Sequence, residues 1–159
     1  MQIAIILGSQ SDLKSVKEGV ELLRKFKVDF ELKVLSAHRS PKQLTSYIQE
    51  AEKKGVKVFI GVAGGSAALP GVIASQTTLP VIGVPVETKS LKGLDSLLSI
   101  VQMPKGVPVG CMTIGKAGFV NAVIFALEIL GIKDKSISLN LKKYKKDMAK
   151  QIKDIRIKL

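Results

Sequence analysis

Short apolar runs rich in Val and Ile alternate with amphipathic stretches along this chain, and this alternation limits the folds that it can adopt. Strands are expected at residues 3–7, 30–35, 56–62, 79–84 and 107–112. Helices are expected between and after them, at residues 13–26, 41–54, 67–75, 94–102 and 117–130. Strands that are apolar throughout and separated by helices are typical of a parallel sheet covered on both faces. The sequence therefore predicts an α/β fold.

The C-terminal segment differs in composition from the rest of the chain. Residues 133–159 contain ten basic and three acidic residues. Their net charge of +7 is more than half of the chain's net charge of +12. Apolar residues recur there at spacings of three and four, which predicts a helix with one apolar face. They are Leu141, Tyr144, Met148, Ile152, Ile155 and Leu159. We expect residues 1–132 to form the α/β domain and residues 133–159 a basic amphipathic helix that contacts another subunit.

This basic segment is a poor candidate for reading nucleic acid. Its cations are mostly Lys, Arg156 is its one Arg, and Tyr144 is its one aromatic residue. Contacts to bases favour Arg, and single strands stack on aromatic side chains. We therefore expect a solvated Lys-rich helix face and no nucleic-acid partner.

Residue counts exclude several kinds of site. The chain has one Cys and one His, which permit no internal disulfide and cannot complete a zinc site of His and Cys ligands.

The longest charge-free stretch, residues 58–86, contains three prolines that would interrupt a membrane-spanning helix. The N-terminus lacks the basic region of a secretory signal. We expect a soluble, cytoplasmic protein in which Cys111 is buried in a strand.

The loop after the first predicted strand offers hydroxyl and carboxylate groups. Ligands bind at the carboxyl ends of the strands in an open parallel sheet, so such loops are the candidate sites. Gly8 permits a tight turn, and Ser9, Ser11 and Asp12 follow it. These residues can present hydroxyl groups and the first amides of a helix to an anion, or they can simply cap that helix.

The loop after the second predicted strand contains the only His. Ser36, His38 and Arg39 lie within four residues of one another. An imidazole exchanges protons near neutral pH, and a guanidinium binds phosphate or carboxylate through its planar fork. A lone His is often structural, but this position beside Arg39 favours proton transfer on an anionic substrate.

The third loop consists of small residues and includes Ala63, Gly64, Gly65, Ser66 and Leu69. Small residues let the backbone approach a ligand closely, although they also suit a tight turn.

A later segment, residues 110–117, nearly matches a phosphate-binding loop but ends in Ala where Mg²⁺ binding requires Ser or Thr. We therefore expect no nucleoside triphosphate site there.

Together these motifs resemble the PurE family of purine biosynthesis. The matching motifs are Gly8-Ser9-x-Ser11-Asp12, Ser36-Ala37-His38-Arg39-x-Pro41, Ala63-Gly64-Gly65, residues 79–86, residues 93–104, and residues 115–118 with Asn121. They occur in order over residues 3–131. The resemblance implies a three-layer, flavodoxin-like parallel sheet with helices on both faces. It also implies a homo-octamer with sites near subunit interfaces, and a reaction without metal or organic cofactor.

The family makes 4-carboxyaminoimidazole ribonucleotide in de novo purine biosynthesis. Class I members are mutases that move the carboxylate of N5-carboxyaminoimidazole ribonucleotide to carbon 4, and class II members carboxylate aminoimidazole ribonucleotide directly with CO2. The resemblance implies that Ser9, Asp12 and Arg39 bind the ribose phosphate. It implies that His38 is the general acid and base at carbon 4, and that residues 63–69 close over the imidazole and CO2.

One position departs from the class I pattern. Ala68 stands where class I members usually have a His, and Ser66 alone matches the class II Arg-Ser-Asn sequence. Mutase and direct carboxylase therefore both stay open, with the mutase favoured by the other motifs. A non-catalytic nucleotide-binding module and an oligomeric scaffold are the remaining alternatives.

Overall fold

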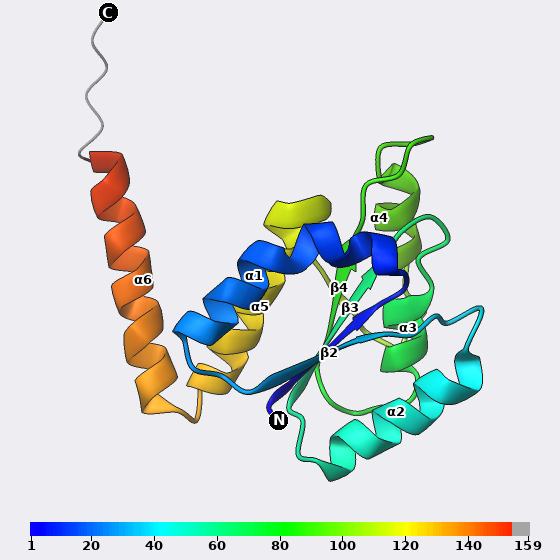
Figure 1. Cartoon of the computed structure of the whole chain (residues 1–159), viewed down its shortest axis with the longest axis horizontal. Coiled ribbons are helices and arrows are strands. Elements are labelled where there is room, and N and C mark those ends of the chain that lie inside the picture. The colour runs from blue at the N-terminus through cyan, green and yellow to red at the C-terminus, as the bar shows by residue number, and fades with distance from the viewer. Residues whose placement is uncertain (154–159) are drawn as a thin grey trace, which may run out of the picture. The chain divides into compact units, whose positions relative to one another are not determined.

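The computed structural model describes residues 1–153 of the 159-residue chain (Figure 1). Five strands form one sheet: β1 (Ile3–Leu7), β2 (Phe30–Val34), β3 (Val58–Ala63), β4 (Val81–Pro85) and β5 (Gly110–Cys111). Their order is β2-β1-β3-β4-β5, and every pairing is parallel. The predicted parallel α/β fold is confirmed. The chain places β2 on one side of β1, and β3, β4 and β5 on the other. Ligands bind in open sheets of this kind at the point between β1 and β3 where the strand order changes direction.

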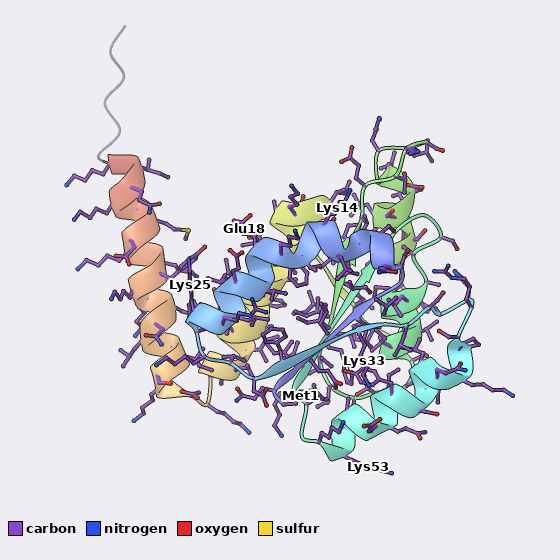
Figure 2. The ribbon with its side chains drawn as sticks, in the orientation of Figure 1. Met1, Lys14, Glu18, Lys25, Lys33 and Lys53 are labelled. Carbon is purple, nitrogen blue, oxygen red and sulfur yellow. The ribbon has the colours of Figure 1, made fainter. Side chains whose placement is uncertain are left out.

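Helices cover both faces of this sheet. They are α1 (Leu13–Lys25), preceded by the short 3-10 helix η1 (Gln10–Asp12), α2 (Pro41–Lys53), α3 (Leu69–Ala74), α4 (Leu94–Val101) and α5 (Gly115–Gly131), and a further helix, α6 (Lys135–Lys153), follows them in the chain. Figure 1 shows α1 and α5 on one side of the sheet and α2 and α3 on the other. Lys14, Glu18 and Lys25 of α1 are exposed (Figure 2), whereas Val16 and Leu23 of the same helix are buried. Helix α1 therefore turns an apolar face toward the sheet.

The core explains why the central strands are apolar at every position. All residues of β1, β3 and β4 are buried, because helices cover them from both faces. On one face, Phe59 and Ile6 of the sheet pack in a cluster with Ile48 of α2 and Ile73 of α3. On the other face, Gly19 lets α1 approach α5, because a Cβ there would lie 2.5 Å from the Phe119 ring.

Strand β5 is shorter than the sequence predicted. A strand was expected over residues 107–112, but only Gly110 and Cys111 pair with β4. Pro108 has no N–H to donate to a ladder, and β5 lies at the edge of the sheet. The expectation of a buried Cys111 is met only in part, because the residue is half-buried. That burial is still enough to raise the pKa of its thiol.

The chain divides into two compact units, Met1–Ala126 and a second that begins at Leu127, within α5. In the second unit Glu128 pairs with Lys145 of α6 at 2.7 Å, and Ile137 and Leu141 are buried. Other residues of the predicted apolar stripe are exposed, Met148 at 40% and Ile152 at 73%. Ile155 and Leu159 of that stripe lie outside the described residues.

Within residues 1–153, no helix has the length and apolar character needed to cross a membrane. The charge-free stretch that resembled a span by length folds as β3, α3 and β4. Its three prolines lie at the start of α3, before β4 and at the end of β4, and none interrupts a helix interior. This placement agrees with the argument from proline made on the sequence.

Candidate active site

A cavity of about 440 Å³ is lined by the loops that follow β1, β2, β3 and β4. All four loops leave the sheet at its carboxyl edge, because the strands are parallel. The lining brings together these residues singled out on the sequence: Ser9, Ser11, Asp12, Ser36, His38, Arg39, Ala63, Gly64 and Leu69. The cavity therefore combines one imidazole, one guanidinium, several hydroxyl groups and a wall of small residues.

The loop after β1 is held by a capping box at the start of η1. The Ser9 N–H donates to Asp12 Oδ2 at 3.1 Å, and Ser9 Oγ accepts from the Ser11 N–H at 3.3 Å. The Ser11 Oγ lies 2.9 Å from Ser9 Oγ and 3.2 Å from Asp12 Oδ1. These reciprocal bonds satisfy backbone groups that a helix start leaves unpaired. They fix both hydroxyl groups at the cavity wall before any ligand binds.

Asp12 is a buried carboxyl group at this wall, with 7% of its surface exposed. Its burial raises its pKa, because a charged carboxylate loses hydration there. Hydrogen bonds from the Ser11 hydroxyl and the Ser9 N–H act in the opposite direction, as does the positive charge of Arg39. Asp12 therefore presents acceptor oxygens whose position is fixed by hydrogen bonds from Ser9 and Ser11.

Arg39 connects the loop after β2 with the loop after β1. Its Nη2 donates to the Gly8 carbonyl at 3.0 Å, and its backbone N–H donates to Ser36 Oγ at 3.2 Å. Ser36 is in turn held by Ser40, whose Oγ accepts from the Ser36 N–H at 2.9 Å. A guanidinium has five N–H groups, so most of them are left for an anion in the cavity. The carbonyl contact orients that cation at the site.

His38 lines the same cavity from the residue before Arg39. The residue is exposed, and none of the hydrogen bonds formed among residues 1–153 involves its imidazole. Both ring nitrogens are therefore open to a bound molecule. Since the chain has no second His, this is the one imidazole that can exchange protons in the cavity.

The loop after β3 forms the small-residue wall. Gly64, Ala67, Ala68 and Leu69 line the cavity, with Ala68 immediately before α3. A Cβ on Gly64 would lie 3.5 Å from Val86 Cβ, so this wall and the next are closely packed. Gly65 and Ser66, which the sequence also singled out, are outside the lining, and their binding role stays a prediction.

The sequence analysis missed the fourth wall. Val86, Glu87 and Thr88 follow β4 and complete the lining. Glu87 is the one charged residue among them, and no glycine-rich motif marks them. The one available signal was their place directly after a predicted strand, which puts them at the same edge of the sheet as the other three loops.

Comparisons with known proteins point to one family. A sequence model described as AIR carboxylase matches residues 2–151. The chain is 50% identical over 156 residues to the N5-carboxyaminoimidazole ribonucleotide mutase of Saccharolobus solfataricus, covering 98% of each chain. It is 54% identical over 147 residues to the protein of that name from Pyrococcus abyssi, covering 92% of this chain and 83% of the relative. A crystal structure of Treponema denticola PurE superposes with a TM-score of 0.86 at 27% identity, over 95% of this chain and 93% of that one.

Proposed function

The chain belongs to the AIR carboxylase family, and from this premise we propose that it is an N5-carboxyaminoimidazole ribonucleotide mutase of purine biosynthesis. The observation that carries the proposal is the meeting of His38 and Arg39 with a small-residue wall in one cavity. Relatives that bear the mutase name share about half of their residues with this chain across nearly its full length.

The proposed reaction is an isomerisation that needs one proton carrier. The bond between the exocyclic nitrogen and the carboxylate carbon breaks, and a bond from that carbon to carbon 4 of the imidazole forms. One proton leaves carbon 4, and one is gained by the nitrogen, so atoms and charge balance. His38 is the group suited to carry this proton, because an imidazole works as both acid and base near neutral pH.

The polar walls suit the ribose and phosphate of the substrate. Arg39 supplies a fixed cation with free N–H donors, and Ser9 supplies a fixed hydroxyl. The Asp12 carboxyl accepts hydrogen bonds, and we assign it to a ribose hydroxyl, because a carboxylate would repel the phosphate. The phosphate end would then lie over the loops after β1 and β2, with the imidazole toward Ala67 and Ala68.

The small-residue wall suits a free CO2 intermediate. CO2 and aminoimidazole ribonucleotide must stay together between bond breaking and bond formation, and water must be kept away. Gly64, Ala67 and Leu69 offer a closely approaching, mostly apolar surface for this purpose. Ala68 leaves open the space where class I members usually have an imidazole, and this favours the direct carboxylase as the second candidate.

A comparison of two substrates tests the proposal. Purified protein is incubated with N5-carboxyaminoimidazole ribonucleotide, or with aminoimidazole ribonucleotide and CO2, and formation of 4-carboxyaminoimidazole ribonucleotide is followed. We expect the first substrate to be converted faster. Faster conversion of the second would identify the carboxylase, and conversion of neither would overturn an enzymatic role in this step.

Replacing Arg39 with Met is expected to raise KM about 100-fold, because charge-assisted bonds to phosphate contribute about 1.5–3 kcal/mol each. The kcat should fall less, since the proton carrier is untouched. Steady-state kinetics at saturating and limiting substrate separate the two effects. Arg24→Met is the matched control, since Arg24 is an exposed residue of α1 outside the cavity lining. A KM within threefold of the control would remove Arg39 from phosphate binding.

We further propose that the chain works in the cytoplasm as a homo-octamer. Leu94, Leu98 and Val101 along one side of α4, and Leu91 just before it, are each 49–57% exposed, which is the kind of surface that subunit contacts cover. Sedimentation velocity is expected to show one octameric species, and deletion of residues 136–159 should shift it to smaller ones. A monomeric full-length chain would contradict the proposal. Cell fractionation checks the location.

A further inference from the structure

Ser96 of α4 is a polar side chain with no exposed surface. It is not among the residues that line the cavity. Burial of a hydroxyl group is unfavourable unless both its donor and its acceptor functions are used. The contacts of Ser96 therefore indicate why a hydroxyl is present there.

The Ser96 hydroxyl joins two loops of the cavity. Its Oγ accepts a hydrogen bond from the Gly65 N–H at 2.9 Å, in the loop after β3. It donates to the Val86 carbonyl at 2.7 Å, directly after β4. One side chain thus completes the backbone pairing of two segments that leave the sheet at neighbouring strands.

Two further contacts from the same helix hold the same loops. The Thr88 hydroxyl donates to Asp95 Oδ1 at 2.8 Å, and the Ser99 hydroxyl, which donates to the Asp95 carbonyl at 2.7 Å, also lies 3.3 Å from the Gly65 carbonyl. Gly65 has a φ of +66°, a conformation that is accessible to glycine without strain. The first turns of α4 therefore fix a loop peptide that has little rigidity of its own.

The atoms held by Ser96 are next to the cavity. Gly64, the neighbour of Gly65, lines it, and so does Val86 itself. Without the hydroxyl, a partly buried N–H and a partly buried carbonyl would lose their partner, and the loops would move to regain hydrogen bonds. Such a movement would change the small-residue wall and leave the loops with Arg39 and Ser9 in place.

We propose that Ser96 is a positioning residue for the mutase reaction, which keeps the loops after β3 and β4 closed around the intermediate. The proposal rests on the proposed function. With the wall in place, CO2 remains beside carbon 4 and His38 until the new bond forms. With the wall displaced, CO2 escapes and aminoimidazole ribonucleotide is released as a side product.

The Ser96→Ala variant tests this role by three readouts. We expect kcat to fall about 10- to 100-fold, because small displacements of reacting groups have effects of that size. KM should stay within about threefold, because the interactions lost do not involve the phosphate. The ratio of released aminoimidazole ribonucleotide to carboxylated product should rise about tenfold or more, if most of the kcat loss is escape of CO2. Circular dichroism and thermal unfolding confirm that the variant is folded at the assay temperature.

Ser75→Ala is the matched control, because the Ser75 hydroxyl also donates to a backbone carbonyl, that of Val72 at 2.9 Å, but lies outside the cavity. It should retain wild-type kcat and product ratio. If Ser96→Ala does not fold, Ser96→Cys keeps the size and a weak donor, and it should show the raised side-product ratio. A folded variant with wild-type kcat and product ratio overturns the positioning role, as does failure of both variants to fold. Absence of turnover in the wild type overturns the proposed function itself.

Discussion

The His38→Asn variant should lose turnover, with kcat lower by about 1,000-fold or more. General acid–base groups contribute factors of about 100 to 10,000 to the rate. Asn has a similar polar shape but cannot carry a proton near neutral pH. The chain has no other imidazole to take over the task, and the position of the usual class I His is occupied by Ala68. The loss should appear in kcat, because the loops after β1 and β3 are unchanged.

The fold of this variant should be intact, because His38 is exposed and its imidazole forms no hydrogen bond with the described residues. Substitutions of that kind change the free energy of unfolding by about 0.5 kcal/mol or less. Thermal unfolding checks this, and calorimetric titration with 4-carboxyaminoimidazole ribonucleotide checks that binding persists. More than a tenth of wild-type kcat in the folded variant would remove His38 from proton transfer.

The Gly118→Ala variant should fail to fold, or unfold at a temperature lower by about 10 °C or more, for a cost above about 4 kcal/mol. A Cβ on Gly118 would lie 1.6 Å from the Thr113 carbonyl oxygen and 2.7 Å from its carbon. Both are backbone atoms, so a side-chain rotation cannot relieve the overlap. The connection from β5 to α5 would have to move, and with it the start of α5 that packs on α1.

Gly110→Ala provides the comparison for this prediction. The nearest atom to a Cβ on Gly110 is 3.6 Å away, which is ordinary van der Waals contact, and the site is in the edge strand β5. Its unfolding temperature should stay within a few degrees of the wild type. If circular dichroism shows the same unfolding temperature for Gly118→Ala and Gly110→Ala, the close approach of Thr113 to α5 is not essential for stability.

The sequence predicted the central strands well because they are buried on both faces, so that each reads as one unbroken apolar run. β1 was predicted at its observed bounds, and β3 and β4 within two residues of theirs. The edge strand was predicted poorly for a related reason. Val107 and Val109 continue the apolar pattern, but Pro108 prevents pairing, and the ladder begins only at Gly110.

The part of the site that depends on reactive side chains was predictable from the sequence. His38, Arg39 and Asp12 stood out because reactive groups followed predicted strands, and the structure brings them to one cavity. Val86 and Ser96 could not be found in the same way. Val86 reads as one more strand residue, and Ser96 reads as a polar position of an amphipathic helix until tertiary packing buries it.

The placement of the cavity along the chain bears on how this gene can recombine. Its lining begins at Gly8 and ends at Thr88, and Ser96 follows shortly after in α4. A crossover between related genes after residue 101 would transmit all of these codons together. Such an event would exchange β5, α5 and α6 while leaving the cavity residues of this chain unaltered. The cavity residues can therefore be inherited as one block, separately from β5, α5 and α6.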